Sequence, residues 1–139
     1  MFVVVGAVLV LAGGFVAAAG GEAPSRHLSW ASAYLVLVCG SAQVLLGGGQ
    51  ALLARRLPGP SLVAAQFAAF NLGNAGVLAG TLSGVTGVLY AGSAVLVVAL
   101  GLFAWATREA VARHRLVIAY RAALVVLAVS VPVGGALAR

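Results

Sequence analysis

The side chains best suited to bind a solute are carboxamides, and all of them fall on two neighbouring apolar segments of this chain. They are Gln43, Gln50, Gln66, Asn71 and Asn74. Gln43 and Gln50 are seven residues apart, and Gln66, Phe70 and Asn74 follow one another at four-residue intervals. Each spacing places its members on one face of a helix. A carboxamide both donates and accepts hydrogen bonds without titrating, so this pattern suits a small neutral or anionic solute.

The remaining polar residues favour no catalytic chemistry. The acids are Glu22 and Glu109, the basic residues are all arginine, the histidines are His27 and His114, and the single cysteine is Cys39. No nucleophile lies beside a base, and no group of metal ligands has a recognisable spacing. We therefore expect no enzyme, no catalytic residue, no cofactor and no metal.

The composition places these residues in a membrane. Of the 139 residues, 63% are hydrophobic and 7% are charged, whereas soluble domains average about 45–50% apolar and about 25% charged residues. A soluble globule could not cover its surface with so few charges. The net charge is +6, and the arginines lie mainly in short loops between apolar runs. This placement is typical of residues that set the orientation of a membrane protein and contact lipid headgroups, rather than of a nucleic-acid-binding surface. The lipid bilayer of the inner (plasma) membrane is the expected environment.

Long apolar runs define the elements that must position the carboxamides. Each run has about 19 or more residues, enough for a helix to cross about 30 Å of hydrocarbon. None alternates in polarity, as the strands of a barrel would. We predict an all-α polytopic integral membrane bundle of five transmembrane helices, a single domain over residues 1–139. The spans are residues 2–20, 28–54, 61–82, 87–107 and 116–138. If the short turn at 83–86 failed, the third and fourth spans would merge into one broken element.

The arginines predict the orientation. Arg55 and Arg56 follow the second span, and Arg108, Arg113 and Arg115 follow the fourth. Cytoplasmic loops carry an excess of basic residues. The N-terminus is therefore expected in the cytoplasm and the C-terminus outside.

The depth of the carboxamides leaves two interpretations open. A rise of 1.5 Å per residue puts Gln43, Asn71 and Asn74 within about 5 Å of the bilayer centre. Polar side chains there often join helices to one another, at about 0.6 kcal/mol each. They also line solute paths. The predicted path residues are Gln43, Gln50, Gln66, Phe70, Asn71 and Asn74, with the ring of Phe70 narrowing the route.

Glycines form a second pattern on the third apolar run. Gly76, Gly80 and Gly84 recur at four-residue intervals, which brings small residues to one face and lets another helix approach closely. The spacing predicts helix packing. The partner helix is either within this chain or in a second copy.

The second apolar run also resembles a known motif. The stretch Cys39–Gly47, CGSAQVLLG, is similar to the second-helix motif of the acetate uptake transporter family, the bacterial succinate–acetate permeases. That motif has paired glycines, a glutamine three residues on and a glycine four beyond. Gly40, Gln43 and Gly47 match it, and Cys39 replaces the first glycine. The similarity spans residues 39 to 127.

Other positions both extend the resemblance and depart from it. Gln50 stands where the family has a glutamate, and Phe67 and Phe70 fall where it has Phe and Tyr. Asn71 and Asn74 replace its Gly and Trp. The family's Asn-Pro-Ala-Pro element and its sixth helix are missing.

The resemblance implies a ring of protomers, each with a narrow path for a small monocarboxylate. In such a path Phe70 would form an apolar constriction, with Gln43 and Asn74 near it.

Two functions of different kinds follow. One is an oligomeric channel or transporter path, in which Arg55, Arg56, Arg113 and Arg115 raise the anion concentration at the inner mouth. The other is a non-catalytic accessory subunit within a larger membrane complex, respiratory or cell-envelope. Short loops, the absence of catalytic groups and the ridges of small residues favour the accessory subunit. The partners are accordingly lipid, further copies of the chain, or subunits of that complex.

Overall fold

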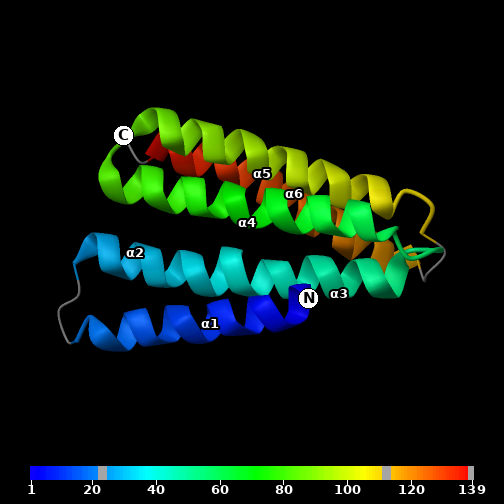
Figure 1. Cartoon of the computed structure of the whole chain (residues 1–139), viewed down its shortest axis with the longest axis horizontal. Helices are drawn as coiled ribbons and strands as arrows, with labels where there is room; N and C mark the ends of the chain where they lie inside the picture. Colours follow the sequence, from blue (N-terminus) through cyan, green and yellow to red (C-terminus); the bar gives the residue numbers. More distant parts are fainter. Residues whose placement is uncertain (22–24, 111–113, 138–139) are drawn as a thin grey trace. The chain divides into compact units, whose positions relative to one another are not determined.

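The computed structural model describes residues 1–21, 25–110 and 114–137, and over those residues it contains helices and no strands. Its elements are α1 (Phe2–Ala19), α2 (Arg26–Tyr34), the π-helical η1 (Leu35–Ala42), α3 (Gln43–Leu53), α4 (Pro60–Ser83), α5 (Thr86–Ala106) and α6 (His114–Leu137). Figure 1 labels all of them except η1, which lies between α2 and α3.

Several of these helices have the length and composition of membrane spans. Within the described ranges, four qualify: α1, the continuous helix Arg26–Leu53 formed by α2, η1 and α3, then α4 and α5. The last helix, α6, has 24 residues. The prediction of an all-helical chain with several helices long and apolar enough to cross a membrane is therefore confirmed. Each of the first four begins and ends within two residues of its predicted range.

Local signals explain where the helices begin and end. The Ser25 hydroxyl caps α2 by accepting a hydrogen bond from the Leu28 backbone N–H at 3.2 Å. Pro60 opens α4, where its missing N–H costs nothing. Gly84 ends α4 in the left-handed conformation at φ 71°, which glycine adopts without strain. Val85 then takes an extended conformation before α5, so the short turn separates the third and fourth spans.

Contacts divide the chain into two compact units, Met1–Gly48 and Gly49–Arg139. In the first unit, α1 packs against α2 and η1 (Figure 1). Gly6 and Gly40 permit this approach, since a Cβ on Gly6 would lie 2.8 Å from the Gly40 carbonyl oxygen. Backbone contact of this kind is typical of membrane helix pairs.

The π-helical turn is the irregular part of the first unit. Ser41 Oγ donates to the Val36 carbonyl oxygen at 2.8 Å, across five residues. Cys39, Gly40 and Ala42 of this turn are buried. Isolated π turns in helices are often found at functional sites. Here the turn immediately precedes Gln43, the first residue of α3.

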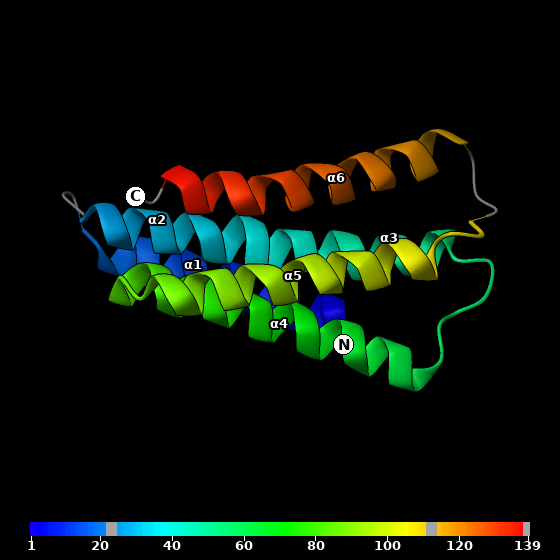
Figure 2. The ribbon, with the colours of Figure 1, turned by 90° about the horizontal axis from the view of Figure 1, so that it is seen from above.

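The second unit is organised around α5. It packs against α4 along one side and against α6 along another (Figure 2). Phe70, Leu96 and Phe103 are almost completely buried in this unit. Other apolar side chains are exposed at the surface, for example Val98 at 59% and Val126 at 66%. In a bilayer, lipid tails would cover such positions.

Candidate functional site

Gln50 and Gln66 form a reciprocal pair between α3 and α4. Gln50 Nε2 donates to Gln66 Oε1 at 3.1 Å, and Gln66 Nε2 donates to Gln50 Oε1 at 2.8 Å. Gln66 Nε2 also donates to the Leu102 carbonyl oxygen of α5 at 3.1 Å. Both amide protons of Gln66 are therefore used, and one buried cluster links three helices.

The loop geometry explains this pairing. Only residues 54–59 separate α3 from α4. The last residues of α3 and the first residues of α4 must therefore lie close to one another, at the two ends of this loop. Gln50 lies shortly before the loop and Gln66 shortly after it, which places them at similar depth. Both are buried, with Gln66 fully inaccessible. A buried amide without a partner costs about 1–3 kcal/mol, and each of these avoids that cost through the other.

The two asparagines bond to their own helix. Asn71 Nδ2 donates to the Phe67 carbonyl oxygen at 2.8 Å, and Asn74 Nδ2 donates to the Phe70 carbonyl oxygen at 2.9 Å. Each acceptor lies one turn earlier in α4. Short polar side chains commonly bond back to the helix in this way. These amide donors are therefore directed along α4.

Phe70 lies in the packed interior between α4 and α5. Its ring meets Phe103 edge to face, with centroids 6.3 Å apart and planes at 89°. The two side chains are 1% and 0% exposed. Aromatic pairs prefer this arrangement.

Glycines bring α4 and α5 together beside these aromatics. A Cβ added to Gly76 would lie 2.8 Å from the Gly92 Cα, and one added to Gly92 would lie 2.6 Å from the Val77 nitrogen. Gly80 likewise meets the backbone of Leu89. The partner of the glycine pattern thus includes α5 of the same chain. Gly84, the third residue of that pattern, ends α4, and a Cβ there would meet nothing within 4 Å.

Gln43 belongs to the other unit and differs from the remaining carboxamides. It is fully buried, and neither Oε1 nor Nε2 has a hydrogen-bond partner among the described residues. It is the first residue of α3, directly after the π-helical turn. An unsatisfied buried amide of this kind is uncommon and invites a functional or structural explanation.

Two cavities lie elsewhere. One is an apolar groove of about 450 Å³ in the first unit, lined by Ala7, Val10, Leu11, Ser41 and Val44. The other, of about 240 Å³, lies in the second unit and is lined by three arginines among other residues. Neither is lined by any of the six predicted path residues.

Two of the four arginines predicted at the inner mouth of the path line a cavity together. Arg55 and Arg56 line the smaller cavity together with Arg108, which the sequence associates with topology alone. Arg115 is exposed at the start of α6 and is not part of the lining. Arg113 lies outside the described residues. A signal for Arg108 was present, because it lies three residues after Trp105, a tryptophan near the end of a span.

No metal-ligand cluster of three or more His, Cys, Asp or Glu side chains is found in the described part of the chain. No protein-family model, curated protein or solved structure matches this chain.

Proposed function

We propose that this chain is a non-catalytic accessory subunit that acts by packing within a larger complex of the inner membrane. It would cross the bilayer five times, with the N-terminus in the cytoplasm and the C-terminus outside. The single observation that carries the proposal is the reciprocal Gln50–Gln66 hydrogen bond. A carboxamide that serves a solute must offer a free donor or acceptor, whereas these two satisfy each other.

The packing of α4 on α5 supports the same function. The contact at Gly76 and Gly92 brings the two backbones together, and the Phe70–Phe103 pair fills the adjacent space. Asn71 and Asn74 direct their amide donors along α4. Five of the six predicted path residues are thereby used in packing inside one unit.

The exposed apolar surface is what such a subunit would offer to lipid and to neighbouring subunits. In α1, Val4 is 68% exposed, Leu11 65% and Phe15 75%. Membrane helices associate through close van der Waals packing and interhelical hydrogen bonds. The chain has enough lipid-compatible surface for both kinds of neighbour.

The experiment is to extract the chain from its native membrane in lipid-preserving polymer particles and measure the mass of the intact assembly. A complex with other subunits in a fixed ratio is expected. Replacing Gln50 and Gln66 together by Leu should leave the composition of that complex unchanged, because the pair acts inside the chain. A chain that is found alone, or only with copies of itself, would contradict the accessory function.

We propose an oligomeric solute path as the second candidate, because Gln43 is buried and neither its Oε1 nor its Nε2 bonds to any residue that the structure describes. Such an amide could bind a small neutral or anionic solute, such as a monocarboxylate. The resemblance of residues 39–47 to the acetate uptake transporters points to the same residue. Gly40 and Gly47 flank it as they do in that motif.

Flux through liposomes distinguishes the second candidate from the first. Acetate, urea and glycerol would be tested with the purified chain, with Gln43→Leu, and with Ser93→Ala as the matched control. Ser93 is a membrane-helix polar residue that bonds only back to Leu89 in α5. Flux that falls in Gln43→Leu and persists in Ser93→Ala would establish a path. Flux no greater than that of empty liposomes would exclude it.

A further inference from the structure

The smaller cavity of the second unit combines positive charge with an apolar wall. It has a volume of about 240 Å³ and is lined by residues of the loop after α3, of the start of α4 and of the C-terminal end of α5. Its charged lining residues are Arg55, Arg56, Arg108 and Glu109, and its apolar lining includes Leu62 and Trp105. We call this site the arginine cavity.

The charges of the arginine cavity are unbalanced. Three arginines and one glutamate line the cavity, so its lining carries two positive charges in excess. Arginine's planar array of donors suits phosphate oxygens in particular. The site therefore selects for a phosphate or a similar oxyanion.

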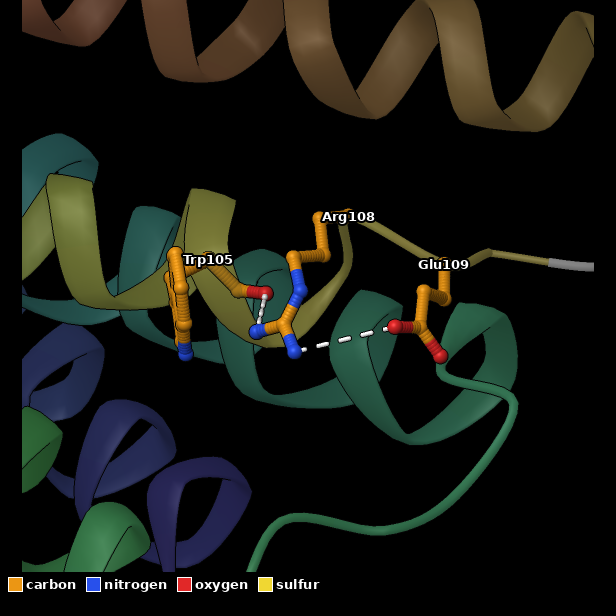
Figure 3. A network of polar contacts seen from close by, with 3 residues as sticks. All are labelled: Trp105, Arg108 and Glu109. Carbon is orange, nitrogen blue, oxygen red and sulfur yellow. Dashed lines mark hydrogen bonds and ion pairs between the residues drawn. The ribbon is translucent and has the colours of Figure 1, made fainter.

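Arg108 is already positioned on one wall of this cavity. Its Cζ lies 3.9 Å from the centroid of the Trp105 ring, and its Nη1 donates to the Trp105 carbonyl oxygen at 3.4 Å (Figure 3). Such stacking orients the guanidinium and lowers the entropy lost when it binds a ligand.

Glu109 is a weak competitor for Arg108. The Arg108 Nη2 to Glu109 Oε1 distance is 3.6 Å, and the two side chains are 50% and 70% exposed (Figure 3). Exposed ion pairs of this length contribute little to stability. A phosphate group could displace the carboxylate at little cost.

The surroundings indicate what carries the phosphate. The cavity lies at the end of α5, one of the helices suited to crossing a membrane. Trp105 is 60% exposed there, and the nearby Leu57 is 73% exposed. Tryptophan favours the boundary between hydrocarbon and headgroups. A ligand with a phosphate beside an apolar body fits this boundary better than a free anion.

We propose that the arginine cavity binds the headgroup phosphate of an anionic glycerophospholipid. Arg55, Arg56 and Arg108 contact the phosphate, while Leu62 and Trp105 contact the glycerol and the upper acyl chain. This assignment depends on membrane insertion but on neither function proposed above.

The test is native mass spectrometry of the full chain in detergent, titrated with phosphatidylglycerol, with phosphatidylcholine, or with inorganic phosphate. Phosphatidylglycerol should bind at least tenfold more tightly than phosphatidylcholine, and millimolar phosphate should not displace it. Replacing an arginine of the cavity by Gln should weaken phosphatidylglycerol binding by about fivefold, with Arg55→Gln/Arg56→Gln losing more than either single variant.

Two further variants make the result specific. Arg26→Gln is the matched control, since Arg26 is an exposed arginine at the opposite end of the Arg26–Leu53 helix. This variant should bind phosphatidylglycerol as tightly as the original chain. Glu109→Gln removes the competing carboxylate and should strengthen binding. Equal binding of the two lipids, or an equal loss in Arg26→Gln, would overturn the proposal. Phosphate binding that needs the same arginines but no lipid would assign the cavity to a soluble anion instead.

Discussion

Gln43 and Gln66 are the same residue type and are buried to the same extent, yet their surroundings differ completely. Both are fully inaccessible. Gln66, in the second unit, has both amide protons and its carbonyl oxygen engaged. Gln43, in the first unit, engages none of these atoms among the described residues. A buried carboxamide in a membrane helix is therefore no sign of a solute path until its partners are known.

Breaking the packing of the second unit should have the largest effect. In Gly92→Leu the new side chain meets backbone atoms of Gly76 and Val77, which cannot move aside as a side chain could. We expect the free energy of unfolding, measured in mixed micelles, to fall by about 3 kcal/mol.

Gly101→Leu is the control for this substitution. Gly101 lies in the same helix, and a Cβ there would meet nothing within 4 Å. Its unfolding free energy should stay within about 0.5 kcal/mol of the original chain. Similar losses at the two positions would show that the effect does not depend on the α4–α5 contact, because leucine forms helix more readily than glycine and helix propensity alone would not lower the stability.

Removing one partner of the glutamine pair should have the next largest effect. Gln66→Leu leaves the Gln50 carboxamide buried without its partner and should lower the unfolding free energy by about 2 kcal/mol. The double variant Gln50→Leu/Gln66→Leu should recover most of that loss, because no amide is then left unsatisfied. A double variant as unstable as the sum of the single variants would mean that the two residues do not interact.

Gln43→Leu should act in the opposite direction. The substitution removes an amide that is desolvated without compensation, so we expect the unfolding free energy to rise by about 1 kcal/mol. The difference in sign from Gln66→Leu is the sharpest test of the comparison between the two glutamines. A clear loss of stability would indicate that Gln43 has a partner in the membrane.

The smallest effect is expected at Asn71. Its side chain donates to the Phe67 carbonyl oxygen of its own helix, and such bonds add little to a helix that is already formed. Asn71→Leu should change the unfolding free energy by less than about 0.5 kcal/mol. A larger change would show that Asn71 contributes to contacts beyond α4.

Part of the candidate site, the similar depth of Gln50 and Gln66, could be predicted from the sequence. Gln50 and Gln66 flank a short loop at comparable distances, so antiparallel helices must bring them to similar depth. Equal depth alone does not choose a partner, because rotation of each helix about its axis also decides which side chains meet. Asn74 illustrates the limit: its position along the chain predicts its depth, but not that its amide donates to the Phe70 carbonyl oxygen of its own helix.

The sequence by itself determined that the chain is helical, where its helices begin and end, and that they suit a membrane. Those properties depend on the length of apolar runs and on local signals such as Ser25, Pro60 and Gly84. Only the tertiary structure decided the hydrogen-bond partner of each carboxamide, the meeting of Gly76 with Gly92, and the addition of Arg108 to Arg55 and Arg56. The reason is physical: helix formation follows from neighbours along the chain, whereas partner choice depends on how helices far apart in sequence rotate and approach.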